Sequence, residues 1–287
     1  MTLTPEQIDD FVRDGFVVVP QAIDPAWCEE QVQQGFRRLG IDEHDPSSFH
    51  VHRTHMPITQ GFAYAEHAPA AEKALRQLLG GRELAHAPIF TDNFILVLPG
   101  EGRPWKPPEA ERGGWHKDGD WFLHFLDSPE QAILGVVLWR DIEPRGGGTY
   151  FAPDSIGPVA RELLAHPEGL RPEQFDFEAL HGECHDFREL TGRAGDVVWM
   201  HPYMLHSISS NALDRPRVLS NPSSSLAGPM CFARPDGAYS PVERCVLRAL
   251  GVERIAFEAT SPRERLHPER EREWKRDREA EKRRLGL

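Results

Sequence analysis

The sequence predicts a mainly β protein with flanking helices, in which short strands build a sandwich or a jelly-roll barrel. Short β-rich runs, separated by Gly and Pro, fill the middle of the chain from about residue 90 to residue 226. Many short strands with turn residues between them are typical of these architectures. We find no internal repeat and no low-complexity linker, so we expect one domain over residues 1–287. It would have an N-terminal helical part (about 1–89), the β core (about 90–226) and a C-terminal helical region with a charged tail (about 227–287).

Two helices and one strand are expected before residue 41. The first helix begins after Thr4, carries its apolar residues on one face and ends at Gly15. The run FVVVP at residues 16–20 predicts a short buried strand. A second amphipathic helix begins after Asp24 and ends at Gly40, because glycine readily adopts the left-handed backbone that closes a helix.

Residues 41–70 are rich in His, Pro and Ser, which predicts a loop. His50 and His52 leave two interpretations open: an H-x-H pair on a strand can bind a metal ion, whereas histidines in a loop are usually exposed. A helix around residues 70–80 is expected to close the N-terminal part.

Five runs in the β core predict strands, and helical segments at 157–166 and 241–250 are expected to pack outside them. The runs are residues 94–100, 132–142, 147–155, 195–209 and 217–226. Gly or Pro stands at or near a boundary of each run, as expected where strands are joined by turns.

The composition argues against several classes of partner. The net charge of −12 is unlike that of nucleic-acid-binding proteins. The longest apolar run, residues 132–139, is too short to cross a bilayer, and the N-terminus lacks the basic start and apolar stretch of a signal peptide. The four cysteines form no C-x-x-C pair. We therefore expect a reduced, cytoplasmic protein whose partner is a small molecule, not nucleic acid or a membrane, and whose oligomeric state is open.

The C-terminal tail has a different composition. Residues 263–284 alternate in charge and have almost no apolar stripe, and from Ser261 onward the chain has ten basic and seven acidic residues. This pattern predicts a solvated, salt-bridged helix or a frayed tail. A partner-binding or oligomerising helix is the alternative.

The segment GWHKDGDW at residues 114–121 contains two candidate metal ligands. A mononuclear iron site of the two-histidine, one-carboxylate type needs three ligands on one face of the metal. His116 and Asp118 are two residues apart, so in an extended segment their side chains point the same way. The third ligand must come from a distant strand, and the run HPYMLHS offers His201 and His206.

Spacing favours one of these two histidines. Pro202 directly follows His201 and cannot donate a hydrogen bond within a central strand, so the strand is expected to break there. Arg217 follows His206 by eleven residues and opens the next strand. A buried arginine there would bind the far carboxylate of a dicarboxylic acid such as 2-oxoglutarate, although a surface arginine beside Arg215 is the alternative. We favour His206 as the ligand and His201 as a core histidine or a hydrogen-bonding neighbour.

In an ordered set of motifs over roughly residues 3–225, the chain resembles the phytanoyl-CoA dioxygenase-like family of non-haem Fe(II)/2-oxoglutarate-dependent oxygenases. The motifs are LTPEQIDDFVRDGFVVVP, WHKDGDW, RGGGTYFAPDS, GDVVWMHPYMLHS and PRVLS. The resemblance implies a double-stranded β-helix (jelly-roll, cupin-like) core.

The resemblance also implies roles for five residues. His116, Asp118 and His206 would be the ligands of Fe(II). Arg217 would be the clamp for 2-oxoglutarate, and Thr149 stands where some relatives place a hydroxyl against that cosubstrate.

The function expected from these features is that of a non-haem Fe(II)- and 2-oxoglutarate-dependent dioxygenase. It would use O₂ to oxidise, by hydroxylation, a C–H bond of a small-molecule metabolite and would release succinate and CO₂. The alternative is a cupin-like metal-dependent isomerase or a small-molecule-binding barrel without redox chemistry. The discriminating residue is Arg217, which a simple binding barrel has no reason to keep.

The sequence departs from the family pattern near the expected pocket mouth. It has GGG at 146–148 and a long insert at 100–114, directly before the metal pair. These departures leave the substrate open. Lys117, Asp120 and Trp121 are expected to face the mouth and the substrate, with a solvated turn as the alternative for the two charged residues.

Overall fold

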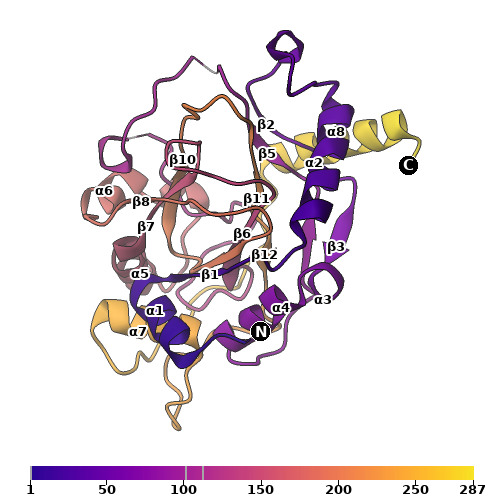
Figure 1. Cartoon of the computed structure of the whole chain (residues 1–287). Coiled ribbons are helices and arrows are strands. Elements are labelled where there is room, and N and C mark those ends of the chain that lie inside the picture. The colour runs from indigo at the N-terminus through magenta and orange to yellow at the C-terminus, as the bar shows by residue number, and fades with distance from the viewer. Residues whose placement is uncertain (1, 101, 112) are drawn as a thin grey trace.

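The computed structural model describes residues 2–100, 102–111 and 113–287, and it shows a mainly β protein with flanking helices (Figure 1). The larger sheet has seven strands in the order β1-β9-β6-β11-β5-β2, with β12 paired to β6, and every pairing is antiparallel. Its strands are β1 (Phe16–Val19), β2 (Arg53–His55), β5 (Ile95–Val97), β6 (Ile133–Leu138), β9 (Val197–Met200), β11 (Arg217–Ser220) and β12 (Ser223–Ser224).

Two smaller sheets accompany the large one. The three-stranded sheet has the order β10-β7-β8 and consists of β7 (Thr149–Ala152), β8 (Arg188–Glu189) and β10 (Leu205–Ile208). A two-stranded sheet pairs β3 (Gly61–Ala63) with β4 (Ile89–Thr91). His116 forms an isolated antiparallel bridge with His206 of β10, so the segment around His116 continues the three-stranded sheet beyond that strand.

Eight α-helices lie around the sheets in the part of the chain that the structure describes (Figure 1). They are α1 (Pro5–Asp14), α2 (Pro25–Leu39), α3 (Tyr64–His67), α4 (Pro69–Leu78), α5 (Ile156–Ala165), α6 (Phe177–Gly182), α7 (Pro241–Leu250) and α8 (Glu269–Leu285). The predicted starts and ends of the first two helices are confirmed. Thr4 and Asp24 accept backbone hydrogen bonds at the two N-termini, and Gly15 and Gly40 close the helices with φ angles of 74° and 66°.

The loop prediction for residues 41–70 is wrong in part. This stretch contains β2, which forms one edge of the seven-stranded sheet, and β3, and the helix α3 begins within it. Strand β1 forms the other edge. Both edge strands therefore come from the part of the chain before residue 90. Strand β1 confirms the strand predicted at residues 16–20, whereas β2 was missed. Strand β2 is only three residues long, so its alternation is too brief to recognise among polar neighbours.

The two faces of the large sheet have different neighbours. Arg53, Val97 and Arg217 stand side by side across β2, β5 and β11, because Val97 pairs with both arginines. Directly paired residues of antiparallel strands project from the same face. Alternate residues project from the opposite face, where the ring of Phe94 lies so close to Gly35 of α2 that a side chain at this glycine would collide with it. Helix α2 thus covers one face, and the two arginines belong to the other.

The C-terminal helix α8 lies beside α2 and the edge of the sheet that ends in β2 (Figure 1, yellow). None of its side chains is buried, which agrees with the prediction of a solvated helix. The cysteines Cys28, Cys184, Cys231 and Cys245 are all free thiols. Among the described residues, no helix combines the length and the apolar character that a membrane span requires.

Candidate metal centre

His116, Asp118 and His206 meet at one point of the structure. One side-chain ligand atom from each residue lies within 4.8 Å of the others. The Nε2 atoms of both histidines are 3.6 Å from the same carboxylate oxygen, Oδ1 of Asp118. Two imidazoles and one carboxylate are the donor set of a two-histidine, one-carboxylate iron site. The structure therefore brings together the three residues that the sequence proposed as ligands.

The two histidine rings are held with Nε2 toward the centre. Nδ1 of His116 lies 2.7 Å from the carbonyl oxygen of Gly114, and Nδ1 of His206 lies 3.1 Å from that of Met204. A carbonyl oxygen only accepts, so each Nδ1 carries the proton and each Nε2 presents a lone pair. Metal-binding histidines usually have their second nitrogen occupied in this way.

The backbone places both histidines. The amide of His116 donates to the carbonyl of His206 at 3.0 Å, and the amide of His206 donates back at 2.9 Å. On its other side, His206 pairs with Phe151 of β7. His206 is thus held in register from both sides, and the extended segment that bonds to it carries His116 and Asp118.

The carboxylate of Asp118 is oriented and ionised. Burial opposes its ionisation, but the contacts with the His206 and His116 imidazoles hold the pKa of Asp118 well below its usual range. Its second oxygen, Oδ2, accepts a hydrogen bond from Nδ2 of Asn221 at 3.2 Å. The donor set, the single negative charge and the supporting hydrogen bonds fit a divalent transition-metal ion. Asn221 was missed in the sequence because no motif marks it.

Arg217 and Arg215 have different environments. Arg217 is 2% exposed, and its guanidinium donates to the carbonyl oxygens of Gly147 at 2.7 Å and Ile95 at 3.0 Å. Arg215 forms an ion pair with Glu143 at 3.0 Å in which both side chains are about half exposed. The turn before β7 therefore contacts Arg217, and Thr149, the first residue of β7, is buried two residues after Gly147.

The GGG segment before β7 has a steric cause. A side chain at Gly148 would collide with the carbonyl oxygen of Leu190, and Gly147 has a φ angle of +83°. Glycine at these two positions lets the chain pass close to its neighbours before it enters β7.

The three candidate substrate residues lie in three different settings. Lys117 is buried, and its Nζ donates to the carbonyl oxygen of Asp118 at 3.1 Å and to Nδ1 of His124 at 2.7 Å. Burial lowers the pKa of Lys117 to about 7. Asp120 forms an ion pair with Arg270 of α8.

Trp121 lines a cavity of about 530 Å³ beside Phe122 and Arg263. The described residues that line this cavity include none of the three candidate ligands. Trp121 therefore lies at a cavity that the three candidate ligands do not line.

His201 lies in the core and not with the three candidate ligands. It is completely buried, its Nδ1 accepts from the amide of Tyr203 at 3.1 Å, and its own amide donates to the carbonyl of Gly15 at 2.7 Å. Burial lowers the pKa of His201 to about 3, so the ring is neutral at ordinary pH. Strand β9 ends at Met200 and β10 begins at Leu205, which confirms the predicted break at Pro202.

Two residues of β2 were missed in the sequence. Arg53 projects from the same face of the large sheet as Arg217, and one of its nitrogens donates to the carbonyl of Ser209 at 3.4 Å. His55 is on this face too, because it pairs with Ile95, two residues from Val97. His52, from the H-x-H pair at residues 50–52, instead has its Nδ1 hydrogen-bonded to the carbonyl oxygen of Pro99 at 2.9 Å. Only long-range strand pairing reveals these positions.

Comparison with known proteins now identifies the family. The model of the family "Phytanoyl-CoA dioxygenase (PhyH)" matches residues 11–218. The chain belongs to the phytanoyl-CoA dioxygenase family. The predicted family is thereby confirmed, and iron and 2-oxoglutarate are the cofactor and cosubstrate that the family implies. The matched stretch includes both histidines, Asp118, Thr149 and Arg217, whereas α7 and α8 lie beyond it.

Solved structures similar to this chain include SnoK, SnoN and HygX. The non-haem α-ketoglutarate-dependent carbocyclase SnoK from nogalamycin biosynthesis is 14% identical, with 79% of this chain and 86% of that chain covered and a TM-score of 0.46. The epimerase SnoN from the same biosynthesis is 19% identical, with 77% and 80% covered and a TM-score of 0.44.

The third structure is HygX from Streptomyces hygroscopicus with nickel and 2-oxoglutarate bound. It is 16% identical, with 79% of this chain and 88% of that chain covered and a TM-score of 0.45. No curated protein matches the sequence at a significant level. Because the three TM-scores lie below 0.5, family membership rests on the match over residues 11–218.

Proposed function

We propose that this member of the phytanoyl-CoA dioxygenase family is an Fe(II)- and 2-oxoglutarate-dependent dioxygenase that hydroxylates a C–H bond of a small molecule and releases succinate and CO₂. The observation that supports this most directly is the convergence of His116, Asp118 and His206, whose ligand atoms lie within 4.8 Å of one another. Three protein ligands leave the remaining positions of an iron ion for the cosubstrate and O₂.

In this proposal the three side chains hold the iron. His116 and His206 would bind through Nε2 and Asp118 through Oδ1, while Asn221 keeps the carboxylate in the required rotamer. When bound, Fe(II) with 2-oxoglutarate supplies the activation of O₂ that C–H oxidation requires. The protein contributes orientation, because the ligand positions are fixed by backbone and side-chain hydrogen bonds of the chain itself.

Arg217 is proposed to bind the far carboxylate of 2-oxoglutarate, with the hydroxyl of Thr149 as a second donor. The carbonyl oxygens of Gly147 and Ile95 fix the Arg217 guanidinium, and its burial would strengthen a charge-assisted contact. Arg53 on the same face adds a second positive charge beside a dianionic cosubstrate. A binding barrel without redox chemistry has no comparable use for these charges.

We also propose that the two larger sheets are the halves of a double-stranded β-helix within one domain. His206 lies on β10 of the three-stranded sheet, and Arg217 lies on β11 of the seven-stranded sheet. The bridge between His116 and His206 joins the segment with His116 and Asp118 to the three-stranded sheet. The site would then lie between the halves, where both sheets contribute to it.

The proposed function is tested by anaerobic titration of the protein with Fe(II) and 2-oxoglutarate. An iron–keto-acid chelate should give a weak visible band near about 500 nm, and the band should require both components. A protein that binds Fe(II) but gives no band and no 2-oxoglutarate-dependent change in its iron spectrum is not an oxygenase of this type. The isomerase or binding-barrel alternative would then stand.

A further inference from the structure

A cavity of about 280 Å³ lies between α8 and the segment that follows β2. Its walls are mainly apolar and include Met56, Ile58 and the side chain of Trp274, which is 48% exposed. His55 and Asn93 are the uncharged polar residues of the lining, and the charged side chains of α8 complete the wall on the side of that helix. Known small-molecule sites are concave and apolar with a few placed polar groups, and this cavity has the size of a compact one.

The cavity adjoins the candidate metal centre through β2. His55 projects from the same face of the large sheet as Arg217, and the chain after β11 carries Asn221, which bonds to Asp118. Burial lowers the pKa of His55. The negative charge of the nearby Asp118 carboxylate acts in the opposite direction.

Helix α8 provides a second connection. Its first turn is fixed to the metal-binding segment, because Arg270 forms an ion pair with Asp120, two residues after Asp118. Trp274 follows one helical turn later, with the guanidinium of Arg270 5.0 Å from its ring. The ring of Trp274 in turn lies 5.7 Å from that of His55.

The polar end of the cavity has a definite hydrogen-bonding pattern. Thr91 donates to Oδ1 of Asn93 at 2.5 Å, which leaves the amide nitrogen of Asn93 to donate to Nε2 of His55 at 3.0 Å. The proton of the neutral His55 ring is then on Nδ1. The ring therefore offers a donor, and the matching ligand group is an oxygen acceptor.

We propose that this cavity binds the organic substrate and that the substrate is a compact, uncharged ring compound with a carbonyl or ether oxygen. Trp274 would stack on the ring, Met56 and Ile58 would enclose it, and His55 would bind the oxygen. This inference rests on the proposed function, because it makes the ligand the molecule that is oxidised. Helix α8, which forms one wall of the cavity, lies beyond the family match over residues 11–218.

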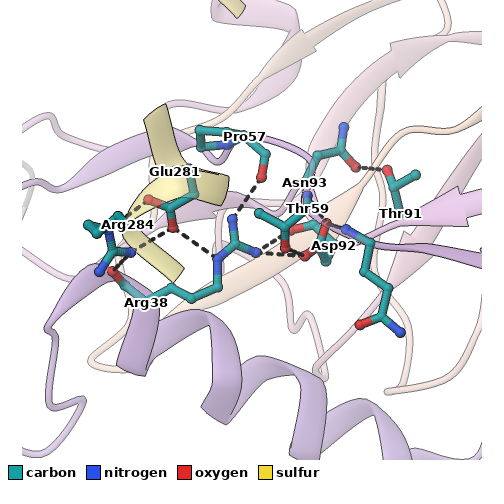
Figure 2. Close-up of polar contacts among 9 residues, drawn as sticks. Arg38, Pro57, Thr59, Thr91, Asp92, Asn93, Glu281 and Arg284 are labelled. Atoms are coloured by element: carbon teal, nitrogen blue, oxygen red, sulfur yellow. Dashed lines mark hydrogen bonds and ion pairs between the residues drawn. The ribbon is translucent and has the colours of Figure 1, made fainter. Parts of the chain in front are cut away.

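Both ends of α8 are fixed to the body of the protein. Near its C-terminal end, Glu281 bonds to Nε of Arg38 at 3.2 Å, and Arg284 donates to the carbonyl of Arg38 at 2.8 Å (Figure 2). The same Arg38 side chain binds Asp92 at 2.8 Å and the carbonyl of Pro57 at 2.7 Å. Arg38 thus connects α8 with the segments that carry Asn93 and the apolar wall of the cavity.

The test uses coumarin, a neutral bicyclic lactone, as the probe and the full chain as the protein. NMR would measure coumarin binding by saturation transfer, first without metal and then with Co(II) or diamagnetic Zn(II) in the metal centre and 2-oxoglutarate present. We expect faster relaxation of the coumarin protons with Co(II) than with Zn(II), because the cavity adjoins the centre. Trp274→Ala should weaken coumarin binding about 3- to 10-fold, whereas Trp274→Phe should retain most of it.

Glu273→Ala is the matched control, because Glu273 is an exposed neighbour on the same helix. Circular dichroism and thermal melting would establish that each variant is folded. Equal coumarin affinity in Trp274→Ala and Glu273→Ala would overturn the proposal, as would binding without any effect of Co(II). Binding to the metal-free protein is measured independently. A chain that binds coumarin at Trp274 but gives no iron–2-oxoglutarate band would therefore contradict the proposed function and leave the cavity as a binding site.

Discussion

His116 and His206 exchange two backbone hydrogen bonds, of 3.0 and 2.9 Å, although 90 residues separate them in the sequence. These backbone hydrogen bonds hold the two residues together, with ring centroids 4.5 Å apart. Ligands that the backbone holds in place lose little conformational freedom when a metal binds. Removing one ligand should consequently abolish binding without unfolding the protein.

We expect His206→Ala to lose stoichiometric Fe(II) binding and all turnover while the protein remains folded. His201→Ala is the informative comparison. Because His201 is fully buried and lies apart from the candidate ligands, its loss should lower thermal stability and change Fe(II) affinity less than about tenfold. Metal titration with a melting curve for each variant measures both effects. Full Fe(II) occupancy in His206→Ala with loss in His201→Ala would reverse the assignment.

Arg217→Ala should weaken 2-oxoglutarate binding by about 2–5 kcal/mol, because a buried charge-assisted contact is lost. Arg215→Ala should cost less than about 1 kcal/mol, since Arg215 pairs with Glu143 at the surface. Anaerobic titration of 2-oxoglutarate into the Fe(II)-loaded proteins measures both values. Arg217→Lys keeps the charge without the planar fork and should fall between them. Equal effects at 215 and 217 would refute the role proposed for Arg217.

Asn221→Ala should lower Fe(II) affinity about 10–100-fold, because the Asp118 carboxylate loses the donor that orients it. Asn221→Asp should be worse, since it places a second carboxylate against the first. Isothermal titration with Fe(II) under anaerobic conditions, or with Co(II), gives the affinities. An unchanged affinity in both variants would mean that the two histidines alone hold Asp118 in place.

The attachment of α8 should depend on pH through Glu281. Hydrogen bonds from Arg284 and Arg38 lower the pKa of this carboxyl below its usual value of 4.5, although burial opposes the shift. A depressed pKa in the folded state means that the contribution to stability is complete above pH 4.5 and is lost as the pH falls through the lower, folded value. The C-terminal attachment of α8 should therefore weaken in acid.

The fluorescence of Trp274 reports this weakening and can be isolated by subtracting the spectrum of Trp274→Phe. Glu281→Gln should show the acid signal, or a much weaker pH dependence, already at neutral pH. An acid transition of the same size in Glu281→Gln would show that another group controls the helix.

The site residues that could be predicted from the sequence are marked by short spacings along the chain, whereas the residues that were missed are placed by long-range strand pairing. His116 and Asp118 are two residues apart, and Arg217 follows His206 by eleven, so spacing brings them to notice. Pro202 distinguishes the two histidines, because a proline directly after His201 breaks the strand before it reaches His206. These are short-range signals, and the structure places the three candidate ligands together.

Arg53, His55 and Asn221 gave no such signal. Their positions depend on the pairing of β2 with β5 and of β5 with β11. Val97 of β5 lies 44 residues after its partner Arg53 and 120 residues before its partner Arg217. Trp274 is harder still to predict. It lies on a helix with almost no apolar stripe. Ion pairs with Arg38 and Asp120 hold that helix in place, and no regular spacing in the sequence marks these two residues.

The ion pair between Asp120 and Arg270 has a thermodynamic consequence. One short segment carries both the candidate ligand Asp118 and the anchor of α8, so we expect metal occupancy and helix docking to be linked equilibria. Linkage is reciprocal: whatever factor the docked helix contributes to iron affinity, bound iron contributes the same factor to docking. Arg270→Ala removes the ion pair with Asp120 together with the contact between Arg270 and the Trp274 ring. It therefore measures one coupling free energy from two directions, by metal titration and by the mobility of the helix. The two values must agree.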